Sequence, residues 1–173
     1  MRELNTSAPA RRKKTLVRKL ITVPGNFRRG CDDFNGGRFF DCHESFEEIW
    51  QQEQGGVRGL YKGLIQVAAA FVHITRSNFA GADRLLRTGL GYMQPYRVEG
   101  AMGFDVDSIC RAAEAAHREV LALGPAGLKA FDLGLRPEYA FDELLLPLEA
   151  VRWGAWGFDA GGRALEMEIV VAE

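Results

Sequence analysis

The stretch RFFDCHESFEEIWQQEQGGVRGLYKGLIQVAAAFVHITRS, residues 38–77, contains two long periodic segments separated by Gly55-Gly56. Apolar residues recur at helical spacing in residues 38–54 and fill most positions of residues 57–77. Because the glycine pair leaves only a short connection, the two helices are expected to be antiparallel neighbours. The stretch therefore predicts a helical hairpin whose second helix is the most buried element.

Helical periodicity continues beyond this hairpin. A third long segment runs from Asn78 to about residue 94, and a fourth runs from about residue 107 to Leu123, just before Gly124-Pro125. Asn78 is a suitable N-cap, because its side chain can accept a hydrogen bond from a free amide of the next turn. The pattern predicts an all-α fold, a compact bundle of antiparallel helical hairpins over residues 31–131.

The pattern weakens after Phe131, where prolines and glycines interrupt every periodic stretch. Residues 166–169 alternate like a strand, but a single strand needs a partner from another extended segment or another chain. We therefore expect residues 132–173 to form an irregular C-terminal extension, packed on the bundle or on a partner.

The first 30 residues are strongly basic, with nine Lys or Arg and a single acidic residue, Glu3. We expect residues 1–30 to be a flexible tail. Three interpretations stay open: a solvated extension, an organelle transit peptide, or a contact with nucleic acid through its phosphates. The tail has no apolar stretch typical of a secretory signal, so export is not expected.

Composition excludes several classes of protein. The chain has 173 residues, of which 47% are hydrophobic and 26% charged, with a net charge of -1. This composition is unlike that of collagenous or wholly disordered chains, and no apolar run reaches the roughly 18 residues that a membrane helix needs. The three cysteines form no C-x-x-C pair, which argues against a disulfide framework and favours a reducing compartment. We expect a cytoplasmic protein without a membrane partner.

A histidine lies within an aromatic stripe of the first hairpin helix. At 100° per residue, His43 shares a narrow face with Phe39, Phe46 and Trp50. Glu47 lies one turn beyond His43 and about 40° round the helix, at the edge of the expected core. Glu44 falls on the polar edge of the same face.

Two polar residues interrupt the apolar second helix of the hairpin. Gln66 and His73 are seven residues apart, so they lie on one side of the helix. If the turn centres near Gly56, one turn of slippage brings Gln66 to Glu47 and His73 to His43. We therefore predict a buried cluster of His43, Glu47, Gln66 and His73, with Glu44 at its rim.

Imidazole and carboxylate groups converging from two helices suit Zn, Mn, Fe or Ni. In this interpretation His43, Glu47 and His73 bind the metal, Gln66 orients a ligand, and Glu44 is the candidate general base of a hydrolase. Two other interpretations stay open. The cluster could be a structural polar network in a non-enzymatic helical adaptor, or a polar seam beneath a protein interface, including one between copies of this chain.

The motifs resemble a known family. They are the run from Phe34 to Trp50, the run Gly63-Leu64-Ile65-Gln66, and the run from His73 to Asn78 followed by Gly81-Ala82. Together they are similar to the small helical proteins of domain of unknown function family 309, over roughly residues 31–96. This chain has Cys42 where the family usually has Ala, and Ser77 where it usually has Gly.

The resemblance implies an all-α bundle and the family's label of metal-dependent hydrolase. The signature positions that match are His43, Glu44, Glu47, Trp50, Gln66, His73 and Asn78. These positions include the four residues of the cluster inferred from periodicity. The substrate is not indicated by either argument.

Overall fold

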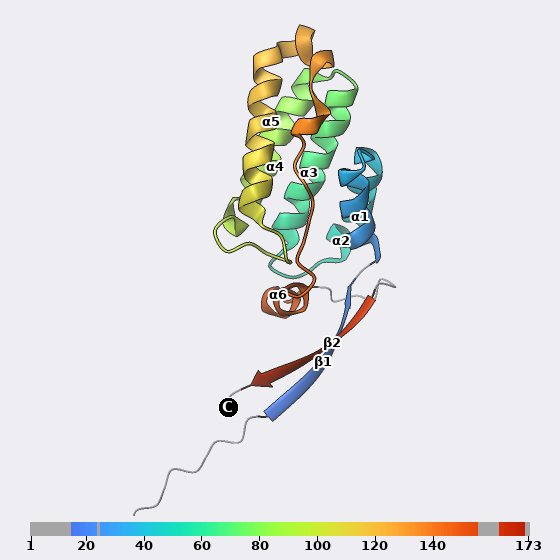
Figure 1. Cartoon of the computed structure of the whole chain (residues 1–173), viewed down its shortest axis with the longest axis vertical. Helices are drawn as coiled ribbons and strands as arrows, with labels where there is room; N and C mark the ends of the chain where they lie inside the picture. The colour runs from blue at the N-terminus through green and yellow to red at the C-terminus, as the bar shows by residue number, and fades with distance from the viewer. Residues whose placement is uncertain (1–14, 24, 156–162, 172–173) are drawn as a thin grey trace, which may run out of the picture.

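The computed structural model of the protein describes residues 15–23, 25–155 and 163–171. Within these residues the chain is mostly helical (Figure 1), with α1 (Gly25–Asn35), α2 (Phe39–Gln52), α3 (Arg58–Thr75), α4 (Phe79–Met93), α5 (Val106–Gly127) and α6 (Leu146–Trp153). Short 3-10 helices are η1 (Gln94–Tyr96), η2 (Leu128–Ala130) and η3 (Leu133–Leu135). The predicted all-α fold is confirmed for this helical body. No helix of the described residues is long and apolar enough to cross a membrane.

Helix α3 is the centre of the bundle. It packs against α2 on one side and α4 on another, while α1 packs on α2 and α5 packs on α4 (Figure 1). Ten of its side chains or glycine positions are buried, because it is apolar on almost every face. The helices therefore surround α3 instead of forming two separate layers.

The α2–α3 hairpin has the expected antiparallel arrangement. The ring of Phe39 lies 5.1 Å from that of Phe71, and the ring of Phe46 lies 6.3 Å from that of Tyr61. In each pair the midpoint between the two residue numbers falls close to Gly55, where the turn occurs. The glycine break and the aromatic spacing thus determine which residues of the two helices face each other.

The Gly55-Gly56 turn is tightly packed by distant parts of the chain. Gly56 N–H donates to the carbonyl oxygen of Trp153 at the end of α6 (3.0 Å), and the Tyr96 hydroxyl donates to the carbonyl oxygen of Gly56 (2.7 Å). A Cβ atom on Gly55 would lie 2.6 Å from the Trp153 carbonyl oxygen. The turn therefore needs glycine because another backbone approaches it closely.

Residues beyond the predicted bundle contribute to its core. Tyr139 is buried, its ring stacks on Phe34 with 3.8 Å between centroids, and its hydroxyl donates to the carbonyl oxygen of Leu64 (2.8 Å). The side-chain amide of Asn35 bonds to both the N–H and the C=O of Tyr139. This segment is held to α1 and α3 by an aromatic stack and by three hydrogen bonds.

The ends of the chain differ from the expectation of a flexible tail and an irregular extension. Strands β1 (Thr15–Val23) and β2 (Arg163–Val171) pair antiparallel, with Arg18 opposite Glu168. Helix α1 begins at Gly25 and places Phe27 in the core, and α6 occupies part of the extension. The pairing joins segments about 150 residues apart, so no local pattern could reveal it. Residues 1–14, most of the basic cluster of the tail, lie outside the described residues.

Two carboxylates of α5 are held by one arginine. Arg97 lies 2.5 Å from Asp107 and 2.5 Å from Glu114. The hydrogen bonds from Arg97 lower the pKa of Asp107 and the pKa of Glu114 below their ordinary values of 3.8 and 4.5. These interactions connect the chain after η1 to the first half of α5.

The stack and hydrogen bonds of Tyr139 predict a graded loss of stability. Tyr139→Phe should lower the free energy of unfolding by about 1 kcal/mol, because one hydrogen bond is lost. Tyr139→Ala should lower it by about 3–5 kcal/mol, because a buried ring is removed. Urea denaturation followed by circular dichroism measures both. Tyr92→Phe, at a 46% exposed tyrosine of α4, is the control; equal losses at both positions would contradict the burial of Tyr139.

The Arg97 contacts predict a stability difference that depends on pH. Carboxylates with a lowered folded-state pKa stabilise the fold above their unfolded-state pKa, and this contribution disappears as the pH falls through the folded-state pKa. Arg97→Gln should therefore be less stable than the unchanged protein at pH 7, and the difference should shrink as the pH falls below about 4. Thermal melts between pH 7 and pH 2 test this, with Arg84→Gln as control. A difference that is constant over this range would rule out the carboxylate contacts as its cause.

Candidate functional site

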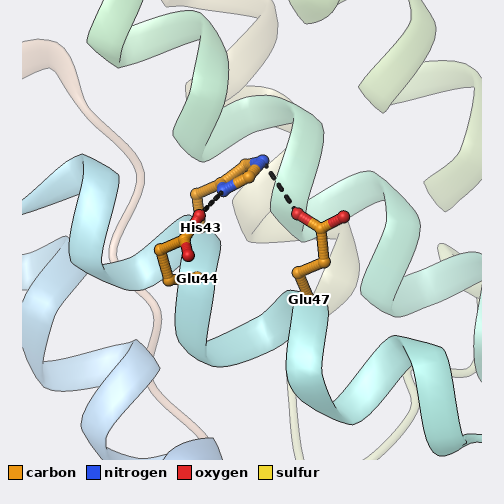
Figure 2. Close-up of side chains that lie close together, drawn as sticks. All are labelled: His43, Glu44 and Glu47. Carbon is orange, nitrogen blue, oxygen red and sulfur yellow. Dashed lines mark hydrogen bonds and ion pairs between the residues drawn. The ribbon is translucent and has the colours of Figure 1, made fainter.

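Helix α2 presents His43 at the edge of its buried face. Phe39, Cys42, Phe46 and Ile49 of this helix point into the core, while the His43 side chain is 26% exposed. The aromatic stripe expected from the sequence is thus present, and His43 lies where it meets the solvent. Figure 2 shows the His43 ring lying between two carboxylates of the same helix.

The two ring nitrogens of His43 have different carboxylate partners. Nδ1 lies 3.1 Å from Oε1 of Glu44, and Nε2 lies 3.3 Å from Oε2 of Glu47 (Figure 2). Glu47 reaches Nε2 because residues four apart on a helix lie one above the other. Glu44 and Glu47 therefore approach the ring at different nitrogens.

This geometry is compatible with a metal ion shared by His43 and Glu47. Ligand atoms of His43, Glu44 and Glu47 all lie within 4.8 Å of one another. Two ligands about 2.1 Å from a tetrahedral zinc ion are roughly 3.4 Å apart, close to the spacing of Nε2 and Oε2. Imidazole and carboxylate are donors that suit Zn, Mn, Fe and Ni.

The position of Glu44 matches a second role known for carboxylates near metals. A histidine that binds a metal through one ring nitrogen usually donates the N–H of the other to a carboxylate or carbonyl. Glu44 is placed to accept such a bond from Nδ1 of His43. This arrangement leaves Nε2, on the Glu47 side, as the nitrogen that can bind a metal.

The group is at the surface, which corrects the expectation of a buried cluster. The side chains of Glu47 and Glu44 are 36% and 59% exposed. Phe40, itself 56% exposed, stacks against His43 with ring centroids 6.1 Å apart. The physical reason is that α3 covers the Phe39 and Phe46 side of α2, while Glu44 and Glu47 lie on the solvent side of that face.

His73 faces α4 instead of joining this group. The Asn78 side chain accepts from Gly81 N–H at the start of α4 (3.1 Å), and its Nδ2 lies 3.0 Å from Nδ1 of His73. The hydrogen-bond network therefore assigns Nδ1 as an acceptor and places the His73 proton on Nε2. Because a metal binds an unprotonated ring nitrogen, His73 offers no ligand atom in this arrangement. The role of Asn78 as an N-cap is confirmed.

Gln66 lies on the same side of α3 and also contacts α4. Its Oε1 accepts a hydrogen bond from the Thr88 hydroxyl (2.5 Å). The two helices pack closely at this contact, because a Cβ atom on Gly89 would lie 3.3 Å from Cβ of Gln66. The aligned pair of Gln66 and His73 was thus correctly placed on one side of α3, but that side faces α4 and not α2.

Trp50 has neighbours that sequence reasoning missed. The guanidinium carbon of Arg58 lies 4.0 Å from the centre of the Trp50 ring, and the Lys62 ammonium nitrogen lies 4.2 Å from it. Both cations come from the first two turns of α3, four residues apart. The antiparallel register could have revealed them, since residues opposite Trp50 across the Gly55 turn fall in this region.

The remaining histidine and the neighbouring cysteine do not take part in the site. His117 of α5 lies 2.7 Å from Asp83 of α4, and this hydrogen bond lowers the pKa of Asp83. Cys42 is buried, and desolvation raises the pKa of its thiol well above the usual range. A protonated, inaccessible thiol is a poor nucleophile, so Cys42 and His43 form no catalytic pair.

A small cavity adjoins the group at the start of α2. It has a volume of about 240 Å³ and is lined by residues of α2 and the end of α3, among them Phe40, Val72 and Arg76. Phe40 also stacks on His43, so this side chain lines the cavity and contacts the candidate metal ligand. The cavity offers space for a small group next to the site.

Comparison with known proteins finds one curated relative of part of the chain. A curated relative is the uncharacterized protein YpuF of Bacillus subtilis (strain 168), which is 31% identical over 84 residues. The match covers 47% of this chain and 48% of the relative, so the chain spans about half the length of the curated relative that it matches. No solved structure matches.

A family model also matches part of the chain. It is described as Domain of unknown function (DUF309) and covers residues 27–85. That range includes α2, α3 and the whole group of His43, Glu44 and Glu47. The resemblance to domain of unknown function family 309, predicted from the motifs, is therefore confirmed for this part of the chain.

Proposed function

We propose that His43 and Glu47 bind a divalent metal ion and that the protein is a metal-dependent hydrolase. The observation that carries this proposal is the 3.3 Å spacing of His43 Nε2 and Glu47 Oε2, with the Glu44 carboxylate at Nδ1. The resemblance to family 309 supports it, since its signature includes these three positions. When bound, the ion would polarise a carbonyl or phosphoryl oxygen of the substrate as a Lewis acid.

Glu44 holds His43 in the form that binds metal. A carboxylate that accepts a hydrogen bond from Nδ1 orients the ring so that Nε2 points toward Glu47. The sequence alone suggested Glu44 as the general base, and its 59% exposure keeps the outer oxygen accessible to a water molecule.

The proposal gives His73 and Gln66 structural roles. His73 would have to break its hydrogen bond to Asn78 and exchange its ring proton to become a ligand. With two protein ligands, the remaining coordination positions are open to water and substrate, so we expect weaker metal binding than at closed structural sites. Exposure of the Glu47 carboxylate is consistent with such an open site.

The chain has three histidines, which makes a direct test possible. His43→Ala should abolish metal binding, because it removes a ligand. His73→Ala should keep metal binding and lower stability by about 1 kcal/mol, because it removes the hydrogen bond to the Asn78 cap. His117→Ala is the control on another helix. Titration with Zn²⁺ and Mn²⁺ in isothermal calorimetry measures affinity, and loss of binding in His73→Ala would restore it as a ligand.

The two glutamates should respond differently to substitution. Glu47→Ala should abolish metal binding, whereas Glu44→Ala should weaken it by about 10- to 100-fold, the range seen when a carboxylate supporting a metal-bound histidine is removed. Asp41→Ala, on the first turn of α2, should leave the affinity unchanged. The same calorimetric titration applies. Equal losses for Glu44→Ala and Glu47→Ala would instead make Glu44 a direct ligand.

A second candidate function is a helical interaction module. Leu144, Leu145 and Leu148, at and before the start of α6, are 85%, 50% and 57% exposed. Apolar side chains gathered in this way are typical of contact surfaces. If neither metal binds to the unchanged protein, the His43 group is a surface hydrogen-bond network and this second function is favoured.

A further inference from the structure

Two cations of α3 lie against one indole of α2. The Arg58 guanidinium carbon and the Lys62 ammonium nitrogen are 4.0 and 4.2 Å from the centre of the Trp50 ring. They are therefore at most about 8 Å from each other. All three residues are half-buried.

These cations have no carboxylate partner among the described residues. Neither Arg58 nor Lys62 lies within ion-pair distance of an acidic group there, and the first turn of α3 contains no acidic residue. Six other arginines of the described residues are paired with carboxylates, namely Arg28, Arg38, Arg87, Arg97, Arg111 and Arg152. Arg58 and Lys62 differ from the remaining unpaired arginines there because both lie on one aromatic ring. The Trp50 group thus carries two positive charges that the described fold does not neutralise.

The cations lie beside the candidate metal ligands. Trp50 follows Glu47 by three residues on α2, and side chains at this spacing are neighbours on a helix surface, with about 5–6 Å between Cβ atoms. An anion held by Arg58 and Lys62 would therefore lie next to the Glu47 carboxylate. A metal ion bound to Glu47 would attract that anion. Without the metal ion, the negative charge of Glu47 would repel the anion.

We infer that Trp50, Arg58 and Lys62 form a binding site for a phosphate group of the substrate. Two positive charges match the double charge of a phosphate monoester better than the single charge of a carboxylate, and the guanidinium can bond two phosphate oxygens at once. The indole holds both cations in place, which lowers the conformational entropy lost when the anion binds. As a substrate site, this phosphate site depends on the proposed metal centre next to it, so the inference rests on the proposed function.

Titration with inorganic phosphate tests the site without requiring activity. The metal-free, full-length chain is titrated and followed by ³¹P NMR and calorimetry. Arg58→Gln/Lys62→Gln should lower phosphate affinity at least tenfold, and each single variant should show part of this loss. Arg84→Gln removes one positive charge from α4, as each single variant does from α3, and should change the affinity less than twofold. Glu47→Gln should raise it severalfold, because a neighbouring negative charge is removed. Acetate should bind much more weakly than phosphate.

The outcomes separate this inference from the proposed function. Phosphate binding that is equally strong in Arg58→Gln/Lys62→Gln, or no phosphate binding by the unchanged chain, overturns the phosphate site even if the metal titrations succeed. Phosphate binding that requires Arg58 and Lys62, in a chain that binds no metal, supports the site and removes the hydrolase proposal. Equal affinity for acetate would contradict the assignment to phosphate. Circular dichroism of each variant verifies that it is folded.

Discussion

Helix α3 has too little polar surface to face water, and the arrangement of the other helices follows from this. Its ten buried positions, which include Leu60, Leu64 and Phe71, span well over half of its circumference, from Ala70 on one side to Ile65 on the other. Burial of such side chains contributes about 1.5–3 kcal/mol each, so the chain is most stable when α3 is covered on every side. Helix α2, helix α4 and the segment around Tyr139 provide this cover. At the hairpin turn, Gly55 and Gly56 have no side chains, so the end of α6 can pack directly against the backbone of the turn.

The candidate site is a consequence of how α2 covers α3. One face of α2 is committed to the core through Phe39 and Phe46, so the next positions round the helix lie at the boundary with water. His43 and Glu47 occupy that boundary, one turn apart. A ligand pair within a single helix is preorganised by the helix itself and does not depend on the register between helices.

Charge is separated along the α2–α3 edge. Glu44 and Glu47 form a negative group around His43, while Arg58 and Lys62 form a positive group around Trp50. Trp50 follows Glu47 by three residues along α2, so the two groups are neighbours on this edge. A metal ion and a phosphate group would each neutralise one of these groups, which makes the two binding events mutually favourable.

Periodicity was sufficient for relations within one helix. It placed His43 in the aromatic stripe, Glu47 at its edge, and Gln66 on the same side of α3 as His73, because 3.6 residues per turn determine relative directions along a helix. It did not determine which neighbour that side of α3 meets. Gln66 and His73 contact Thr88 and Asn78 near or on α4, and so they are separated from His43.

The sequence by itself determined the all-α bundle, the antiparallel hairpin and the grouping of His43, Glu44 and Glu47, since all of these follow from local spacing and a short connection. Only the tertiary structure decided the neighbours of His73, the burial of Tyr139 and the pairing of β1 with β2. The physical reason is that contacts between distant segments depend on which helix packs against each face of its neighbour. That sharing depends on packing of the entire chain, which no local pattern encodes.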